Sequence, residues 1–171
     1  MNPTPEFSRL VRLDTIGDAP RTVGIEADAG EQGALSVRFG LLAIDRLAAT
    51  AALTRDGDIV AVNGTIQAEV VQPCVASGEP VPAHIDQPFT LRFVPDNGVD
   101  VDEEEVELTA DDLDTLCDAG SAIDLGEAVA QTLALALDPF PRAPDADDAL
   151  REAGVVGEEE MSPFAALKAL K

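Results

Sequence analysis

Two long runs of alternating apolar and polar residues in the middle of the chain constrain its fold more than any other feature. The first extends over residues 60–70 and the second over residues 81–93. Such alternation is typical of strands with one buried face. Asn63-Gly64 would usually indicate a hairpin turn, but the alternation passes through this pair without a change of phase. We therefore expect Gly64 to lie inside a strand, at a bulge or a close approach of another group.

The residues that precede these runs extend the expected sheet. Residues 47–53 also alternate, and the four residues from Arg55 to Asp58 favour a hairpin turn. Together these segments predict an antiparallel meander of three or more strands with one polar face. Residues 6–16 resemble a further strand. Residues 28–39 fit two elements: Asp28 and Glu31 have the spacing of a helix capping box, residues 35–39 alternate like a strand, and we favour the helix.

Residues 124–137 carry the strongest helix pattern in the chain. Asp124 is a good capping residue, with Glu127 three positions later. An apolar stripe at four-residue spacing follows, formed by Leu125, Val129, Leu133 and Leu137. Two prolines then end the helix at residues 139–141. We expect this helix to pack on the apolar face of the sheet. The fold class is therefore predicted as α+β: an antiparallel β-sheet or partly closed barrel with a packed helix and an acidic C-terminal tail.

The charge of the chain is strongly negative and unevenly distributed. The net charge is −22; residues 1–94 carry 12 acidic and seven basic residues, and residues 95–171 carry 21 and four. Proteins that bind nucleic acid by neutralising phosphates are usually basic, so a basic protein partner fits this charge better. Solubility alone, or adaptation to a salty cell, would explain it as well. No apolar run is long enough to span a membrane, and we expect a soluble cytoplasmic protein.

The last ten residues form a short amphipathic and basic pattern. Ser162 can cap a helix, Pro163 suits its first position, and Phe164, Leu167 and Leu170 share one face. A helix this short is unstable alone in water, so it should dock on its own domain or on another molecule. We predict three parts: a single α+β domain over residues 1–142, an acidic flexible linker over 143–160, and a helical contact segment over 161–171.

The sequence contains no recognisable catalytic set. His84 is the only histidine and falls at an outward position of its strand, and Cys74 and Cys117 are not arranged in a CxxC pair. Motifs for nucleotide binding and for zinc hydrolases are missing. We therefore expect a protein that is not an enzyme and has no cofactor, no bound metal and no small-molecule substrate. Each thiol should be free and partly buried.

Several segments together resemble the YceD family, the large ribosomal RNA subunit accumulation proteins. No single segment is specific, but their order and spacing are. The similarity is carried by residues 62–72 leading to Cys74, 79–93, 123–127, 135–141 and 162–167. Many relatives carry a CxxC pair in the loop after the central strand, whereas here Cys74 is followed three residues later by Ser77. A four-ligand zinc site is therefore not expected.

The resemblance implies a bacterial factor in ribosome biogenesis that supports the synthesis or accumulation of large-subunit ribosomal RNA. It implies no reaction. We expect an acidic adaptor that contacts a ribosome-assembly protein or a basic ribosomal protein through Pro163, Phe164, Leu167 and Leu170, so that contact with ribosomal RNA would be indirect. The alternative is a protein that binds ribosomal RNA directly through arginines of its N-terminal part, which are Arg9, Arg12, Arg21, Arg38, Arg46, Arg55 and Arg92.

Overall fold

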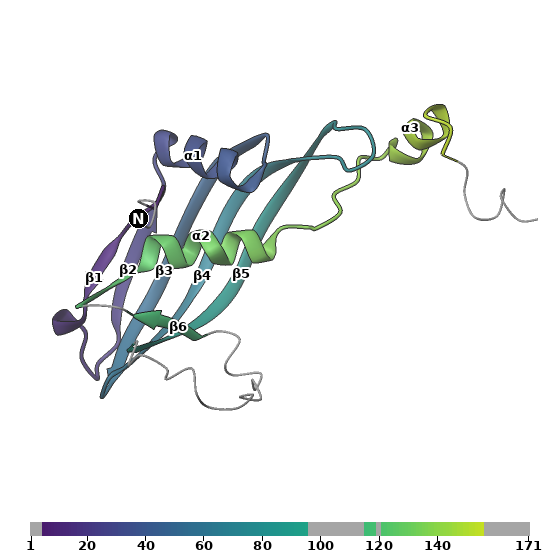
Figure 1. Cartoon of the computed structure of the whole chain (residues 1–171). Coiled ribbons are helices and arrows are strands. Elements are labelled where there is room, and N and C mark those ends of the chain that lie inside the picture. Colours follow the sequence, from purple (N-terminus) through teal and green to yellow (C-terminus); the bar gives the residue numbers. More distant parts are fainter. Residues whose placement is uncertain (1–4, 96–114, 119–120, 156–171) are drawn as a thin grey trace, which may run out of the picture.

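A curved five-stranded sheet forms the body of the protein in a computed structural model, which describes residues 5–95, 115–118 and 121–155 (Figure 1). The strands follow the order β2-β3-β4-β5-β6. The first four pair antiparallel, and β6 pairs parallel with β5. Their bounds are β2 Arg21–Glu26, β3 Ala43–Asp56, β4 Ile59–Pro73, β5 Pro80–Pro95 and β6 Thr115–Asp118.

A second, two-stranded sheet joins two segments that are far apart in the sequence. β1 (Leu10–Arg12) pairs antiparallel with β7 (Ala122–Asp124), and a 3-10 turn, η1 (Leu13–Thr15), follows β1. The expected α+β class and antiparallel meander are confirmed. The barrel is not: the described strands form an open sheet beside a separate strand pair. The strand expected over residues 6–16 is shorter, because η1 turns the chain directly after Arg12.

The hairpin and the in-strand glycine are both found as predicted. Asp56 pairs with Ile59 across a tight turn, in which Gly57 has a left-handed φ of 60°. Gly64 lies within β4, where a Cβ atom would lie 2.6 Å from the carbonyl oxygen of Thr50 and 2.8 Å from the ring of Phe89. The close approach of these groups excludes a side chain at this position.

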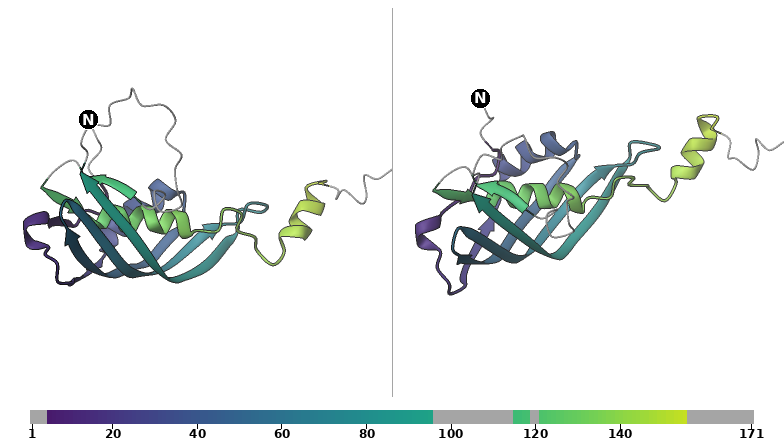
Figure 2. Two further views of the ribbon diagram at one scale, coloured as in Figure 1. Left: turned by 90° about the horizontal axis from the view of Figure 1, so that it is seen from below. Right: turned by 60° about the horizontal axis from the view of Figure 1, so that its bottom comes forward.

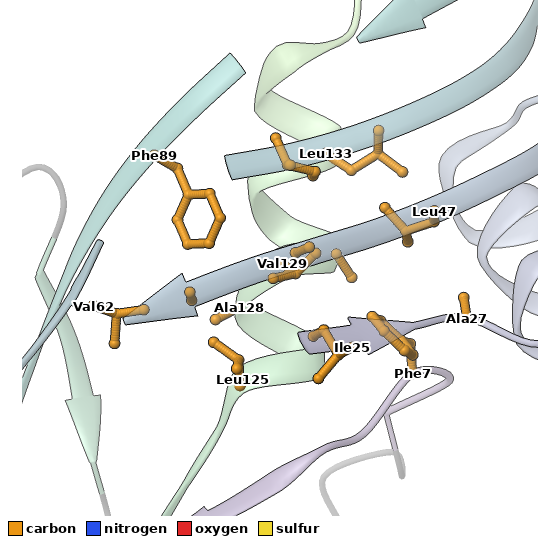
Figure 3. Close-up of a cluster of buried hydrophobic side chains, with 14 of the residues drawn as sticks. Phe7, Ile25, Ala27, Leu47, Val62, Phe89, Leu125, Ala128, Val129 and Leu133 are labelled. Atoms are coloured by element: carbon orange, nitrogen blue, oxygen red, sulfur yellow. The ribbon is translucent and has the colours of Figure 1, made fainter. Parts of the chain in front are cut away.

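Helix α2 (Leu125–Ala136) lies across the curved inner side of the sheet (Figure 2). The side chain of Asp124 accepts a hydrogen bond from the backbone N–H of Glu127, so the predicted cap is confirmed. Leu125, Val129 and Leu133 are fully buried and meet apolar side chains of the strands (Figure 3). Burial of each such side chain stabilises the fold by about 1.5–3 kcal/mol, so this stripe fixes the helix on the sheet.

Helix α1 (Ala29–Phe39) lies on the same side of the sheet as α2, between β2 and β3 in the chain (Figures 1 and 2). Its capping box is present: the Asp28 carboxylate accepts from the N–H of Glu31, and the Glu31 carboxylate accepts from the N–H of Asp28. The helix prediction for residues 28–39 is therefore right. Gly40 ends the helix with a left-handed φ of 65°, a conformation that glycine adopts without strain.

Helix α3 (Ala146–Glu152) extends beyond the end of the sheet (Figure 1). It falls within the segment predicted as an acidic linker, so seven residues of that segment are helical. The division into domain, linker and contact segment stays a prediction, as does the acidic tail.

Candidate functional site

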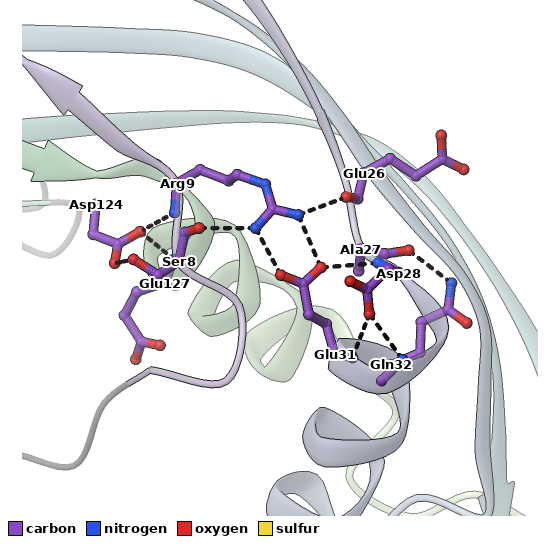
Figure 4. A network of polar contacts seen from close by, with 10 residues as sticks. Ser8, Arg9, Glu26, Ala27, Asp28, Glu31, Gln32, Asp124 and Glu127 are labelled. Carbon is purple, nitrogen blue, oxygen red and sulfur yellow. Dashed lines mark hydrogen bonds and ion pairs between the residues drawn. The ribbon is translucent and has the colours of Figure 1, made fainter.

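A network of ion pairs fixes the N-terminal part of the chain to both large helices (Figure 4). The guanidinium of Arg9 donates to both oxygens of Glu31 at 2.7 and 2.8 Å, and also to the carbonyl oxygen of Glu26. Such bidentate pairs combine charge with a fixed geometry. The hydrogen bonds from Arg9 lower the pKa of Glu31. Asp124 completes the network by accepting from the hydroxyl of Ser8 and the N–H of Arg9.

Arg38 makes a second set of ties on the outside of the helices. Its guanidinium lies 2.7 Å from the carboxylate of Glu127 and 2.8 Å from that of Glu6. These contacts raise the pKa of Arg38, and the hydrogen bonds from Arg38 lower the pKa of Glu127. Arg38 therefore connects α1 to α2 and to the residues before β1. Sequence reasoning missed both networks, because nothing in the spacing indicates that residues 31 and 9, or 38 and 127, are neighbours.

These pairs bear on the arginines that could contact RNA. Arg9, Arg12 and Arg38 each have a carboxylate oxygen within 2.8 Å. Arg55 donates to the carbonyl oxygens of Gly57 and Leu13. A phosphate would have to compete with these partners, so four of the seven N-terminal arginines already have a structural role.

The outer face of the sheet is mostly polar. His84 is exposed on it, opposite Glu69, as predicted for a surface histidine. A hollow of about 390 Å³ on this face is lined by Gly24, Ile25, Glu26, Arg46, Ala48, Ala49, Thr50, Thr65 and Gln67. None of these lining residues is aromatic, and base stacking on aromatic side chains is the usual basis of single-strand binding.

The loop between β4 and β5 forms a tight turn around Cys74. The N–H of Cys74 donates to the carbonyl oxygen of Glu79, and the N–H of Gly78 donates to the carbonyl oxygen of Cys74. Sγ of Cys74 accepts from the N–H groups of Ala143 at 3.3 Å and Ala76 at 3.4 Å. These bonds, with others from Ser77, lower the pKa of the buried Cys74 thiol to about 7. Hydrogen bonds to the charged form outweigh the opposing effect of burial.

The chain that follows α2 is attached to this turn by several contacts. The amide of Gln72 donates to the carbonyl oxygen of Asp138, and the N–H of Val75 donates to that of Pro141. A small second core then forms outside the main one, in which Cys74, Ala143 and Ala146 are buried. We call residues 138–146 the strap, because they fasten the chain after α2 to the β4–β5 loop.

Comparison with known proteins identifies the chain. The sequence model of a family described as large ribosomal RNA subunit accumulation protein YceD matches residues 62–171, well over half of the sequence. The chain belongs to the YceD family. No curated protein and no solved structure matches it. The matched region contains most of β4, all of β5 and α2, the Cys74 turn and the strap. The family is named for an RNA that accumulates and not for a reaction.

The Cys74 turn of this YceD-family chain does not fit a zinc site. Ser77, three residues after Cys74, carries no thiol, and Sγ of Cys74 already accepts hydrogen bonds from two backbone N–H groups. In the described part of the chain no three His, Cys, Asp or Glu side chains converge as metal ligands. Cys74 is a free thiol and is more deeply buried than we expected. The side chain of Cys117 lies outside the described residues.

The residues predicted to contact a partner cannot be placed. Pro163, Phe164, Leu167 and Leu170 all lie outside the described residues. None of the described helices is long and apolar enough to cross a membrane.

Proposed function

We propose that this YceD-family protein is a non-catalytic adaptor of ribosome biogenesis. It supports synthesis or accumulation of large-subunit ribosomal RNA by contacting a basic ribosome-assembly or ribosomal protein. The observation that carries this proposal is the internal pairing of the arginines in a chain of net charge −22. Most of the positive charge that could meet a phosphate is engaged within the fold, while acidic groups remain in excess.

An acidic surface accelerates encounter with a basic protein. Complementary charges on two molecules raise the rate at which they associate, and like charges lower it. Both effects weaken as the salt concentration rises. Bare ribosomal RNA would be repelled at long range by the same charge. The apolar stripe of Phe164, Leu167 and Leu170 supplies a contact that salt does not weaken. Steering by the acidic surface and capture by the stripe together give an adaptor that binds basic proteins in preference to RNA.

A pull-down of the full chain with and without nuclease treatment tests the proposal. We expect basic ribosomal or assembly proteins to be retained after nuclease treatment, and their capture to weaken, without disappearing, as the salt concentration is raised. Capture that disappears with nuclease would mean that RNA bridges the contact, and the adaptor role would be wrong.

Two variants separate the adaptor from direct RNA binding in cells. Phe164→Ala removes the apolar contact, and Arg46→Glu reverses an exposed charge on the outer face of the sheet. We expect Phe164→Ala to lower the ratio of large-subunit to small-subunit ribosomal RNA, and Arg46→Glu to leave it unchanged. The opposite pattern would favour the RNA-binding alternative.

A further inference from the structure

An apolar groove opens at the end of the molecule where α1 and α2 both stop. Its volume is about 510 Å³, within the range of about 300–1,000 Å³ that accommodates sizeable ligands. Its wall includes Leu135 and Val75, which are 88% and 56% exposed. The full lining is Phe39, Gly40, Leu41, Gln72, Pro73, Val75, Ala134, Leu135, Leu137, Asp138, Pro139 and Pro141.

Two polar side chains of this groove already have hydrogen-bond partners. The side-chain amide of Gln72 donates to the carbonyl oxygen of Asp138, and the carboxylate of Asp138 accepts from the N–H of Phe140. Most of the surface that lines the groove is apolar, which suits an apolar occupant better than a polar ligand. Leu42 and Phe140, which are 51% and 72% exposed, adjoin the lining in sequence. Of the seven large apolar side chains exposed in the described chain, four thus gather at this end, as is typical of an interaction surface.

We propose that the groove binds the C-terminal segment of the same chain, residues 162–171, as a short amphipathic helix. On a helix with 100° per residue, Phe164, Leu167 and Leu170 cover one face and Ala165 lies on the other. An apolar groove that receives residues at such spacing is a common mode of helix recognition. The segment needs a docking surface, since it is too short to be helical alone.

The connecting chain is long enough for this contact. α3 begins beside the groove, since Ala146 packs with Cys74 and Ala143, and Val75 is bonded to Pro141. Its seven residues extend about 10 Å at 1.5 Å per residue. From Val155, the last described residue before the segment, nine residues lead to Phe164 and span up to about 30 Å. The chain can therefore fold back past α3 to the groove.

The charges near the groove suit the two lysines of the segment. The carboxylates of Glu79 and Asp145 lie together beside the Cys74 turn, and their hydrogen bond raises the pKa of Glu79. Two carboxylates in contact are stabilised by a nearby cation. Lys168 borders the apolar stripe, Lys171 is the last residue of the segment, and both carry that charge. A segment joined to the groove by its own chain also has a high effective concentration there, which favours it over a free competitor.

This inference goes beyond the adaptor role and adds a condition to it. The stripe cannot contact the groove and a partner at once, so a partner that uses Phe164 must displace the segment. Affinity for that partner is reduced by the fraction of chains in which the groove is occupied.

Backbone hydrogen exchange in the full chain tests the proposal. We expect the amides of residues 164–171 to exchange about tenfold or more slowly than in a free peptide, since a docked helix must open before it exchanges. Leu135→Lys should remove this protection. Val37→Lys is the matched control: Val37 is 84% exposed on α1 and does not line the groove, so protection should persist. From the side of the segment, Leu167→Lys should abolish protection and Ala165→Lys should retain it.

Three results would overturn the proposal. Exchange at the free-peptide rate in the parent chain would mean that the segment is not docked, and protection that survives Leu135→Lys would place it elsewhere. Protection that grows with protein concentration would identify a second copy as the occupant. A cellular measurement separates this proposal from the adaptor role. Suppose that the segment is unprotected, and that Leu135→Lys still lowers large-subunit RNA in cells whereas Val37→Lys does not. The groove then binds a partner, so docking within the chain is wrong and the adaptor role stands.

Discussion

Gly126 provides the sharpest test of how α2 is attached to the N-terminal part of the chain. This glycine is the second residue of the helix and lies against the backbone that leads into β1. A Cβ atom there would lie 2.5 Å from the carbonyl oxygen of Phe7 and 2.8 Å from the backbone nitrogen of Arg9. Both are backbone atoms, which cannot turn aside as a side chain can. In Gly126→Ala the two segments must therefore separate by about 1 Å to restore ordinary contact distances.

The cost of this separation follows from the contacts that it strains. Overpacking costs about 1–3 kcal/mol. The displaced backbone also carries the hydrogen bonds from Arg9 N–H to Asp124 and from Leu125 N–H to the carbonyl oxygen of Arg9, each worth about 1 kcal/mol. Replacing glycine by alanine in a helix returns about 1 kcal/mol. We expect a net loss of about 2–4 kcal/mol.

Thermal unfolding measures this loss directly. For a chain of this size 1 kcal/mol corresponds to about 2–4 °C, so the Tm of Gly126→Ala should fall by about 4–16 °C. Gly33→Ala is the matched control, because Gly33 lies in α1 and a Cβ atom there would meet no neighbouring segment within 4 Å. Its Tm should stay or rise. If both variants unfold at the same temperature, the tight contact between α2 and residues 7–9 does not exist, and the packing described above is wrong.

Three further outcomes are expected. Val129→Asp should unfold the domain or cost several kcal/mol in a denaturant titration, since it buries a charge at a fully buried position, whereas Leu135→Asp on the exposed side of the same helix should not. Arg38→Met should lower the Tm at pH 7. The fold lowers the pKa of Glu127 below its ordinary 4.5, so the ionised carboxylate stabilises the folded state above pH 4.5. The difference in Tm between Arg38→Met and the parent should therefore shrink as the pH falls below 4.5. A chelator should leave the Tm unchanged, and zinc bound in a one-to-one ratio after dialysis would refute the metal-free turn.

The elements that the sequence predicted well are those whose signals are local. The alternation of β4 and β5, the turn at Gly57, the capping box of α1 and the Asp124 cap of α2 each depend on residues within a few positions of one another. The position of Gly64 inside a strand followed from the unbroken phase of the apolar and polar alternation alone. The burial of Leu125, Val129 and Leu133 followed from their periodicity, because an apolar helix face must be covered, whereas Leu137 lies just after the end of α2 and is only partly buried.

What the sequence could not supply are the contacts between distant segments. β6 is only four residues long and follows an acidic stretch without alternation, so no local pattern indicated it. The parallel pairing of β6 with β5 depends on how the elements pack. So does the ion pair between Arg38 and Glu127, which are 89 residues apart in the sequence. The apolar groove is likewise invisible in sequence, since its lining comes from α1, β4, α2 and the strap.

The Cys74 end of the molecule should be the part that opens most readily, and this bears on the proposed docking. Within the described part of the chain its core contains three buried residues, Cys74, Ala143 and Ala146, separate from the large cluster under α2. Regions with few buried apolar contacts open at lower free energy than the main core. The strap holds this end through three hydrogen bonds at Gln72, Cys74 and Val75. Pro141 and Val75 also line the groove, so opening of the strap would dismantle it. Occupation of the groove by residues 162–171 would therefore stabilise the strap, and release of the segment to a partner would loosen it.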